Sequence, residues 1–126
     1  TPRDDPCMLK KHDAKQEYYF EEGCYITEIS NSTDDEDVSI ARARVEEAQQ
    51  TKWHYLENTT ERYVIVHGEG LAEIGDGEPL RVSIGDVVVI PPDTRQRIKN
   101  TGKGDLVFLV VCSPRFHTKD YHAISE

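Results

Sequence analysis

The centre of the chain carries side chains that could bind a metal ion or move a proton. His54 is followed by Glu61, then by Tyr63, and Gln96 stands further downstream. Imidazole, carboxylate and amide oxygen can all ligate divalent cations, and a carboxylate or a phenol can also transfer protons. If these residues converge in the fold, they would form a site for metal-assisted or acid–base chemistry on a small molecule.

Strand geometry predicts which neighbours share this site. Residues two apart on a β-strand point to the same face, so Leu56 should accompany His54, and Tyr63 should accompany Glu61. The result would be a small, largely apolar pocket that holds a few polar groups, which is the usual composition of a ligand site.

Alternating alanines and arginines upstream of these residues predict whether the pocket carries positive charge. Arg42 and Arg44 alternate with Ala41 and Ala43. We expect the small alanine side chains to face inward. The opposite register would place a guanidinium pair in the pocket and favour an anionic substrate.

The elements that must position these residues are short β-strands. No apolar pattern of helical period runs longer than about two turns, whereas β-rich segments bounded by Gly, Pro, Asn and Asp recur along almost the whole chain. Such spacing predicts an all-β sandwich or barrel. The expected strands are 24–29, 38–45, 52–56, 62–66, 70–74, 80–82, 87–90, 96–99 and 106–112.

Two spaced motifs run through these strands. The first contains His54, Glu61 and Gly68, and the second contains Gly85, Pro91, Gln96 and Asn100. Over residues 38–114 this pattern resembles the two motifs of the cupin superfamily, G(X)5HXH(X)3-4E(X)6G and G(X)5PXG(X)2H(X)3N. The resemblance implies a single-domain cupin-type jelly-roll β-barrel. We expect an N-terminal arm over 1–22, the barrel over 23–116 and a C-terminal tail over 117–126.

Four positions depart from the cupin motifs. Ala48 and Asp93 replace glycines, while Leu56 and Gln96 replace two of the histidines. The resemblance implies a divalent metal ion (Zn, Mn, Fe or Ni), here with the reduced ligand set His54, Glu61 and Gln96, whose open positions would take water or substrate. The alternative is a cupin without metal that uses these three residues as a hydrogen-bonding cluster.

The composition of the chain argues against polyanionic binding partners. The 126 residues hold 15 Lys and Arg against 24 Asp and Glu, a net charge of −9, so we expect no nucleic-acid or anionic-membrane partner. Most of the excess lies in residues 1–61. We interpret its acidic groups, Glu17, Glu21 and Glu22 with the run 34–37, as a solvated arm and a solvated loop.

Location and assembly are predicted from weaker signals. No apolar run is long enough to cross a bilayer, no signal peptide is recognisable, and Cys7, Cys24 and Cys112 form no CxxC pair, which favours the reducing cytoplasm. The segments 61–70 and 104–112 contain unbroken apolar runs, at 63–66 and 106–112. This pattern suits strands that are covered on both faces, and it predicts a homodimer or a wrapping arm.

Two functions are compatible with these observations. The first is a metal-dependent isomerase or lyase acting on a small oxygenated, sugar-like substrate, with Glu61 or Tyr63 as the proton-transfer group. The second is a non-catalytic cupin that binds or senses a small ligand. A dioxygenase ranks below both, because its iron would require more imidazole than one histidine provides.

Overall fold

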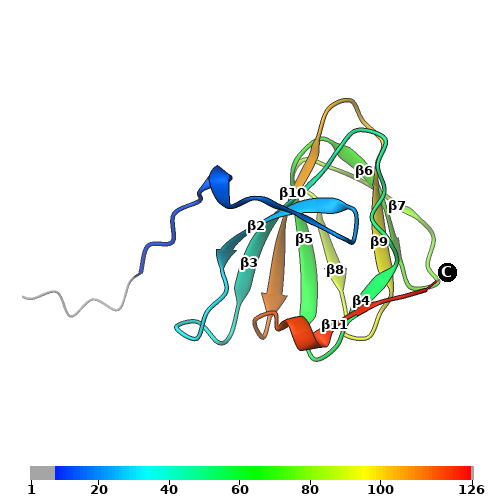
Figure 1. Ribbon diagram of the computed structural model, residues 1–126. Coiled ribbons are helices and arrows are strands. Elements are labelled where there is room, and N and C mark those ends of the chain that lie inside the picture. Colours follow the sequence, from blue (N-terminus) through cyan, green and yellow to red (C-terminus); the bar gives the residue numbers. More distant parts are fainter. Residues whose placement is uncertain (1–7, 126) are drawn as a thin grey trace, which may run out of the picture.

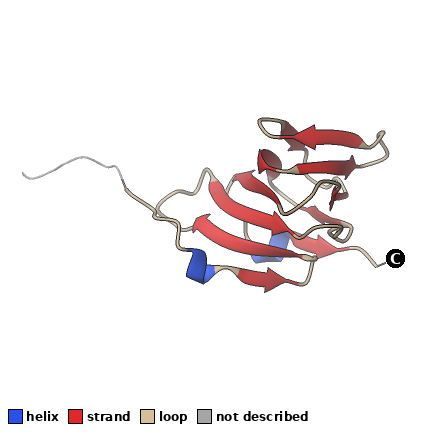
Figure 2. Cartoon of the chain, turned by 90° about the horizontal axis from the view of Figure 1, so that it is seen from above, coloured by secondary structure: helices blue, strands red, loops and turns tan. Residues whose placement is uncertain are grey.

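The computed structural model describes residues 8–125 and is built almost entirely of antiparallel strands. Cys7 and the first part of the predicted arm lie outside the described residues. The two short 3₁₀ turns are η1 (Ala14–Gln16) and η2 (Thr118–Asp120). Figure 2, seen from above, shows strands in two layers with helix confined to these turns. Within residues 8–125, no helix has the length and apolar character needed to cross a membrane.

The strands form two sheets that face each other (Figure 1). The six-stranded sheet has the order β1-β2-β3-β10-β5-β8, and the five-stranded sheet has the order β11-β4-β9-β6-β7. Strands adjacent in these sheets are often distant in sequence, as expected for a jelly roll. The bounds are β1 (Tyr18–Phe20), β2 (Cys24–Ser30), β3 (Ser39–Val45), β4 (His54–Leu56), β5 (Thr60–His67), β6 (Glu69–Ile74), β7 (Leu80–Ser83), β8 (Val87–Ile90), β9 (Gln96–Asn100), β10 (Leu106–Ser113) and β11 (Tyr121–Ala123).

Every strand predicted from the sequence is present, and the all-β cupin-type architecture is confirmed. The strands that the sequence did not reveal are β1 and β11, at the two ends of the described chain. β1 pairs with β2, so part of the predicted arm is a sheet strand. β11 pairs with β4, so the predicted tail extends the other sheet.

The core lies between the two sheets, where alternate residues of each strand face inward. In β5 the burial pattern alternates over most of its length, with Tyr63 and Ile65 inside. Tyr63 packs against Phe108 of β10 with ring centroids 4.4 Å apart. The other buried apolar residues of this core are Cys24, Ala43, Val45, Ala72, Val82, Val88, Ile90, Ile98 and Leu106.

The turns at the motif glycines share one backbone conformation. Gly68 and Gly85 have φ values of 87° and 94°, and the two replacements, Ala48 and Asp93, have φ values of 65° and 61°. Aspartate tolerates this left-handed region well, but alanine is strained there. The turn geometry of the motifs is therefore kept even where glycine is not.

Candidate active site in the barrel

A cavity of about 240 Å³ opens between the two sheets and is closed by segments from both ends of the chain. The predicted pocket residues His54, Leu56, Glu61 and Tyr63 all line it. Gln96 does not. The remaining lining residues are Tyr18, Phe20, Glu21, Glu22, Ile26, Glu28, Asn31, Ser39, Ala41, Ala43, Phe108, Val110, Cys112, Phe116, Thr118 and Tyr121.

His54 is positioned by strand β4 and by the carbonyl of Lys52. Its Nδ1 lies 2.8 Å from the Lys52 oxygen, and because a carbonyl can only accept, Nδ1 carries the ring proton. Burial lowers the pKa of His54, although the negative charge of Glu61 opposes that shift. The neutral ring therefore presents the bare lone pair of Nε2.

Glu22 faces that lone pair. Its Oε1 lies 3.2 Å from His54 Nε2, and its side chain is 12% exposed. Burial raises the pKa of Glu22 to about 7, against the lowering effect of hydrogen bonds from Cys24 and Tyr121. Near neutral pH the carboxyl is thus protonated in a large fraction of molecules and can share its proton with His54.

The backbone explains why a residue of the arm reaches the barrel interior. The Lys52 N–H donates to the Glu22 carbonyl at 2.8 Å, and the Lys52 carbonyl accepts from His54, so both partners are tied to one residue. Gly23 ends the turn with φ of 107°, and a Cβ there would lie 3.2 Å from the Gln50 oxygen. The expectation that Glu22 belongs to a solvated arm is wrong, because this turn folds back onto β4.

Glu61, at the start of β5, carries an unpartnered atom. The residue is 6% exposed, and its Oε1 has no hydrogen-bond partner within the described residues. Burial raises the pKa of Glu61 to about 7, and the charge of Glu22 adds to that rise, while His54 and a hydrogen bond from Gln96 lower it. A buried oxygen of this kind requires a proton or a ligand.

Tyr63, which lines the cavity, is hydrogen-bonded to Gln96, which does not line it. The Tyr63 hydroxyl donates to Gln96 Oε1, and Gln96 is fully buried. Burial raises the pKa of Tyr63 well above its ordinary value of 10. Tyr63 therefore keeps its proton, and the Gln96 amide oxygen is already engaged.

The predicted metal ligands do not form a complete donor set. His54 and Glu61 have atoms facing the cavity, but the amide oxygen of Gln96 accepts the Tyr63 hydroxyl and Leu56 stands where the motif has a histidine. In residues 8–125, no group of three or more His, Cys, Asp and Glu side chains is arranged to hold a metal ion. The residues present thus do not fit a metal held by His54, Glu61 and Gln96, since three protein ligands are the usual minimum.

The C-terminal segment forms the far wall of the site. Tyr121 of β11 stacks on His54, with ring centroids 5.4 Å apart, and makes an edge contact with Phe20 at 5.1 Å. The sequence gave no reason to expect an aromatic cover over His54 from the predicted C-terminal tail. That contact depends on β11 pairing with β4, which no local pattern reveals.

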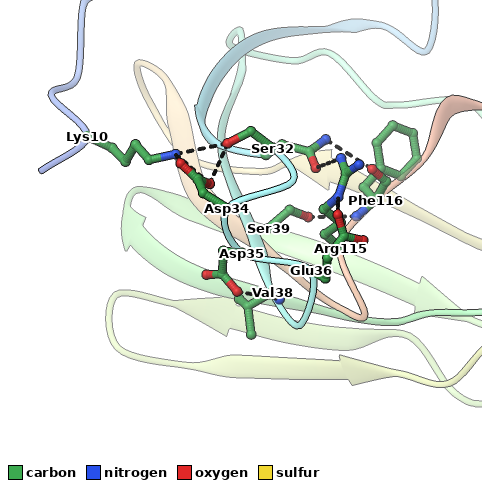
Figure 3. A network of polar contacts seen from close by, with 10 residues as sticks. Lys10, Ser32, Asp34, Asp35, Glu36, Val38, Ser39, Arg115 and Phe116 are labelled. Atoms are coloured by element: carbon green, nitrogen blue, oxygen red, sulfur yellow. Dashed lines mark hydrogen bonds and ion pairs between the residues drawn. The ribbon is translucent and has the colours of Figure 1, made fainter. Parts of the chain in front are cut away.

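A polar network holds residues that line the cavity, among them Ser39 and Phe116 (Figure 3). Asn31 donates from Nδ2 to the Phe116 carbonyl at 3.0 Å, and the Phe116 N–H donates to Ser39 Oγ at 2.9 Å. Arg115 bridges Asn31 and Glu36. The acidic run 34–37, expected to be a solvated loop, thus has one member that helps to hold a lining residue.

The arginines lie outside the cavity. Arg44 pairs with Glu17 at 2.7 Å and stacks over Tyr25, while Arg42 lies 3.6 Å from Glu17. Ala41 and Ala43 face inward, which confirms the predicted register. The opposite register, with a guanidinium pair in the pocket, is excluded.

Comparison with known proteins agrees with this geometry. The Cupin domain family model matches residues 41–112. The protein MJ1618 of Methanocaldococcus jannaschii is 30% identical over 112 residues, which is 87% of this chain and 89% of that protein.

Solved structures with the same fold include a nucleoside dehydratase and a predicted oxalate decarboxylase. The Streptomyces nucleoside dehydratase Pac13, also solved with uridine, has a TM-score of 0.74 at 18% identity, covering 93% of this chain and 92% of that one. A Thermotoga maritima protein described as a predicted oxalate decarboxylase has a TM-score of 0.74 at 22% identity, covering 85% and 99%. The motif glycine turns, the two-sheet barrel and the family match together show that this chain belongs to the cupin family.

Proposed function

We propose that this cupin is an isomerase or lyase-type enzyme that moves a proton on a small oxygenated, sugar-like substrate in the barrel cavity. The observation that carries the proposal is the pairing of His54 Nε2 with Glu22 across 3.2 Å, beside the unpartnered Oε1 of Glu61. General acid–base catalysis works best when the pKa of the catalytic group lies near the working pH. Burial moves both carboxyls into that range.

Two proton-transfer groups suffice for such a reaction. The Glu22–His54 pair accepts a proton from a carbon next to a carbonyl or hydroxyl group. In a lyase step, Glu61 donates a proton to the leaving hydroxyl, which departs as water while a double bond forms. In an isomerisation, the proton returns to a neighbouring carbon. Tyr63, the other candidate from the sequence, holds its proton in the bond to Gln96, and Gln96 in turn donates to Glu61.

No step of this proposal uses a metal ion, because the donor set does not fit one. The carboxylate-lined pocket also argues against oxalate, the substrate in the name of one similar structure, since oxalate is a dianion. Pac13 is named a dehydratase, and dehydration belongs to the lyase class of reactions proposed here.

The test is proton exchange with solvent. Small hydroxy-carbonyl compounds and nucleosides are incubated with the protein in D2O, and deuterium incorporation and water loss are followed by NMR. The expected result is exchange that depends on Glu61 and is lost in Glu61→Gln, with the exposed Glu78→Gln as the matched control. Exchange equal in Glu61→Gln and wild type would refute the role of Glu61. Tight binding of a compound with no exchange would favour the non-catalytic binding cupin.

We further propose that the chain forms a homodimer through the outer face at β8. β8 is an edge strand of the six-stranded sheet, and Val66, Val87 and Val89 on this face are exposed. A self-complementary apolar edge of this kind suits two-fold pairing with a second copy. Light scattering should give twice the chain mass for wild type and the monomer mass for Val89→Lys, and a monomeric wild type would contradict it.

A further inference from the structure

We propose that the barrel pocket selects a small organic cation, a protonated amine on a skeleton of sugar size or smaller, and rejects phosphates and carboxylates. This deepens the proposed function by naming the charge of its substrate. It rests on the same cavity, but the charge preference is a property of binding and can be measured without turnover.

The first argument is the charge of the lining. Glu21, Glu22, Glu28 and Glu61 line the cavity, and no lysine or arginine of residues 8–125 does. Glu61 is buried, Glu22 is nearly so, and Glu21 and Glu28 are exposed, so an anion in this site would meet like charge at two desolvated carboxyls, which is costly at low dielectric. A cation would be attracted to the same cluster.

The arginines near the barrel cannot turn inward to change this balance. Arg44 is held by Glu17 and Asp105 on the outer face. Arg95 and Arg97 stack over the outer surface of Trp53, each with its guanidinium 4.3 Å from a ring centroid. These three guanidinium groups are therefore engaged outside the barrel.

The second argument is the free acceptor inside the cavity. Glu61 lines the cavity, and its buried Oε1 has no partner among the described side chains and backbone groups. A neutral donor could satisfy this atom, but a charged N–H donor makes a stronger bond to the ionised carboxylate and can pass Glu61 the proton that the proposed acid step requires. The atom thus marks the position where the ammonium group of a ligand would bind.

The third argument is the aromatic wall around the carboxylates. Tyr18, Phe20, Phe116 and Tyr121 line the cavity together with the acidic groups. Aromatic faces attract ammonium groups and also pack against the apolar faces of a sugar ring or an alkyl chain. The cavity of about 240 Å³ lies just below the range that holds drug-sized ligands, so the ligand is small.

The test compares compounds that share a skeleton and carry a positive, a neutral or a negative group. Glucosamine, glucose, glucuronate and glucose 6-phosphate form one series, and cyclohexylamine, cyclohexanol and cyclohexanecarboxylate form the other. Binding is measured by calorimetry and thermal shift with the full chain. The amine of at least one series should bind about tenfold tighter than its neutral member, and the acids and the phosphate should not bind.

Variants identify the acceptor. Glu61→Gln should remove the preference for the amine and leave the neutral compound unchanged, whereas Glu78→Gln should behave as wild type. Tighter binding of an acid or phosphate, equal binding of amine and alcohol, or no binding by either amine would overturn the inference. Absence of proton exchange with intact amine preference would instead count against the proposed catalytic function alone.

Discussion

His54 Nε2 lies 3.2 Å from Glu22 Oε1, and both residues are tied to the backbone of Lys52. Because His54 Nδ1 donates to the Lys52 carbonyl, Nε2 of the neutral ring must accept. Glu22 therefore faces His54 as a protonated carboxyl, or the pair carries the proton as an ion pair. Burial raises the pKa of Glu22 to about 7, so near neutral pH a large fraction of molecules lacks this shared proton, and in them the pair can accept a proton from a substrate.

Replacing Glu22 by glutamine should impair proton transfer. The amide keeps the shape of the side chain but cannot accept a proton, so the His54 lone pair loses its exchangeable partner. We expect the exchange rate to fall by about 10²- to 10⁴-fold, the usual contribution of a general acid or base. The measurement is deuterium incorporation over a range of pH. A rate unchanged from wild type would remove Glu22 from the mechanism.

The two buried carboxyls should make stability depend on pH. Burial raises the pKa of Glu61 from 4.5 to about 7, so the folded state binds a proton that the unfolded state has released in this interval. This stabilisation is fully present below pH 4.5 and is lost as the pH rises through 7. Between pH 5 and 8, ionisation of Glu61 should lower the free energy of unfolding of wild type by on the order of 3 kcal/mol. Glu61→Gln, unfolded by denaturant at the same pH values, should lack this decrease.

His54 changes the free energy of unfolding with pH in the opposite direction, so its contribution must be separated from that of Glu61. Its pKa is lowered by burial, so its contribution to stability is lost as the pH falls below the unfolded value of 6.5. Comparison of wild type with Glu61→Gln at each pH isolates the carboxyl, because both proteins retain His54. Parallel pH profiles for the two proteins would contradict the raised pKa.

Metal content should be well below one ion per chain. The reason is the donor set, in which Gln96 is engaged by Tyr63 and only His54 and Glu61 of the predicted ligands face the cavity. Elemental analysis of protein purified without chelator is the measurement, and thermal unfolding with and without EDTA is the control. One ion per chain that is lost in both His54→Ala and Gln96→Ala would restore the metal site expected from the sequence.

Ala48→Gly should stabilise the fold. Ala48 has φ of 65°, where alanine is strained by about 1 kcal/mol or more and glycine is not. After the entropy that glycine adds to the unfolded chain, a net gain of about 0.5 kcal/mol is expected. Ala123→Gly in β11 is the matched control and should destabilise. Equal effects of the two substitutions on the free energy of unfolding would contradict the strain at Ala48.

The sequence predicted the barrel well because its signals are local. Alternating apolar residues mark the strands, and Gly68, Gly85 and Pro91 mark the turns, so each element is visible within a few residues. The sequence also explained one departure from the cupin motifs, because Asp93 has the left-handed backbone conformation that aspartate tolerates in place of glycine. The inward placement of Ala41 and Ala43 followed from alternation alone.

The sequence did not predict the composition of the site, because that depends on long-range pairing. Glu22 reaches His54 only through a turn that hydrogen-bonds to Lys52, and Tyr121 covers His54 only because β11 adds to β4. Neither pairing leaves a periodic signal. The role of Gln96 also required the structure, since only there is its oxygen seen to accept from Tyr63.

The most direct test of the central claim is a 13C NMR titration of the glutamate side-chain carboxyls. Glu22→Gln and Glu61→Gln assign the two resonances. The account predicts that both carboxyls titrate near pH 7, far above the ordinary value of 4.5, because both are buried in the cavity. If both titrate between about pH 4 and 5, as exposed glutamates do, the cavity does not hold an acid–base pair suited to neutral pH and the proposed function fails.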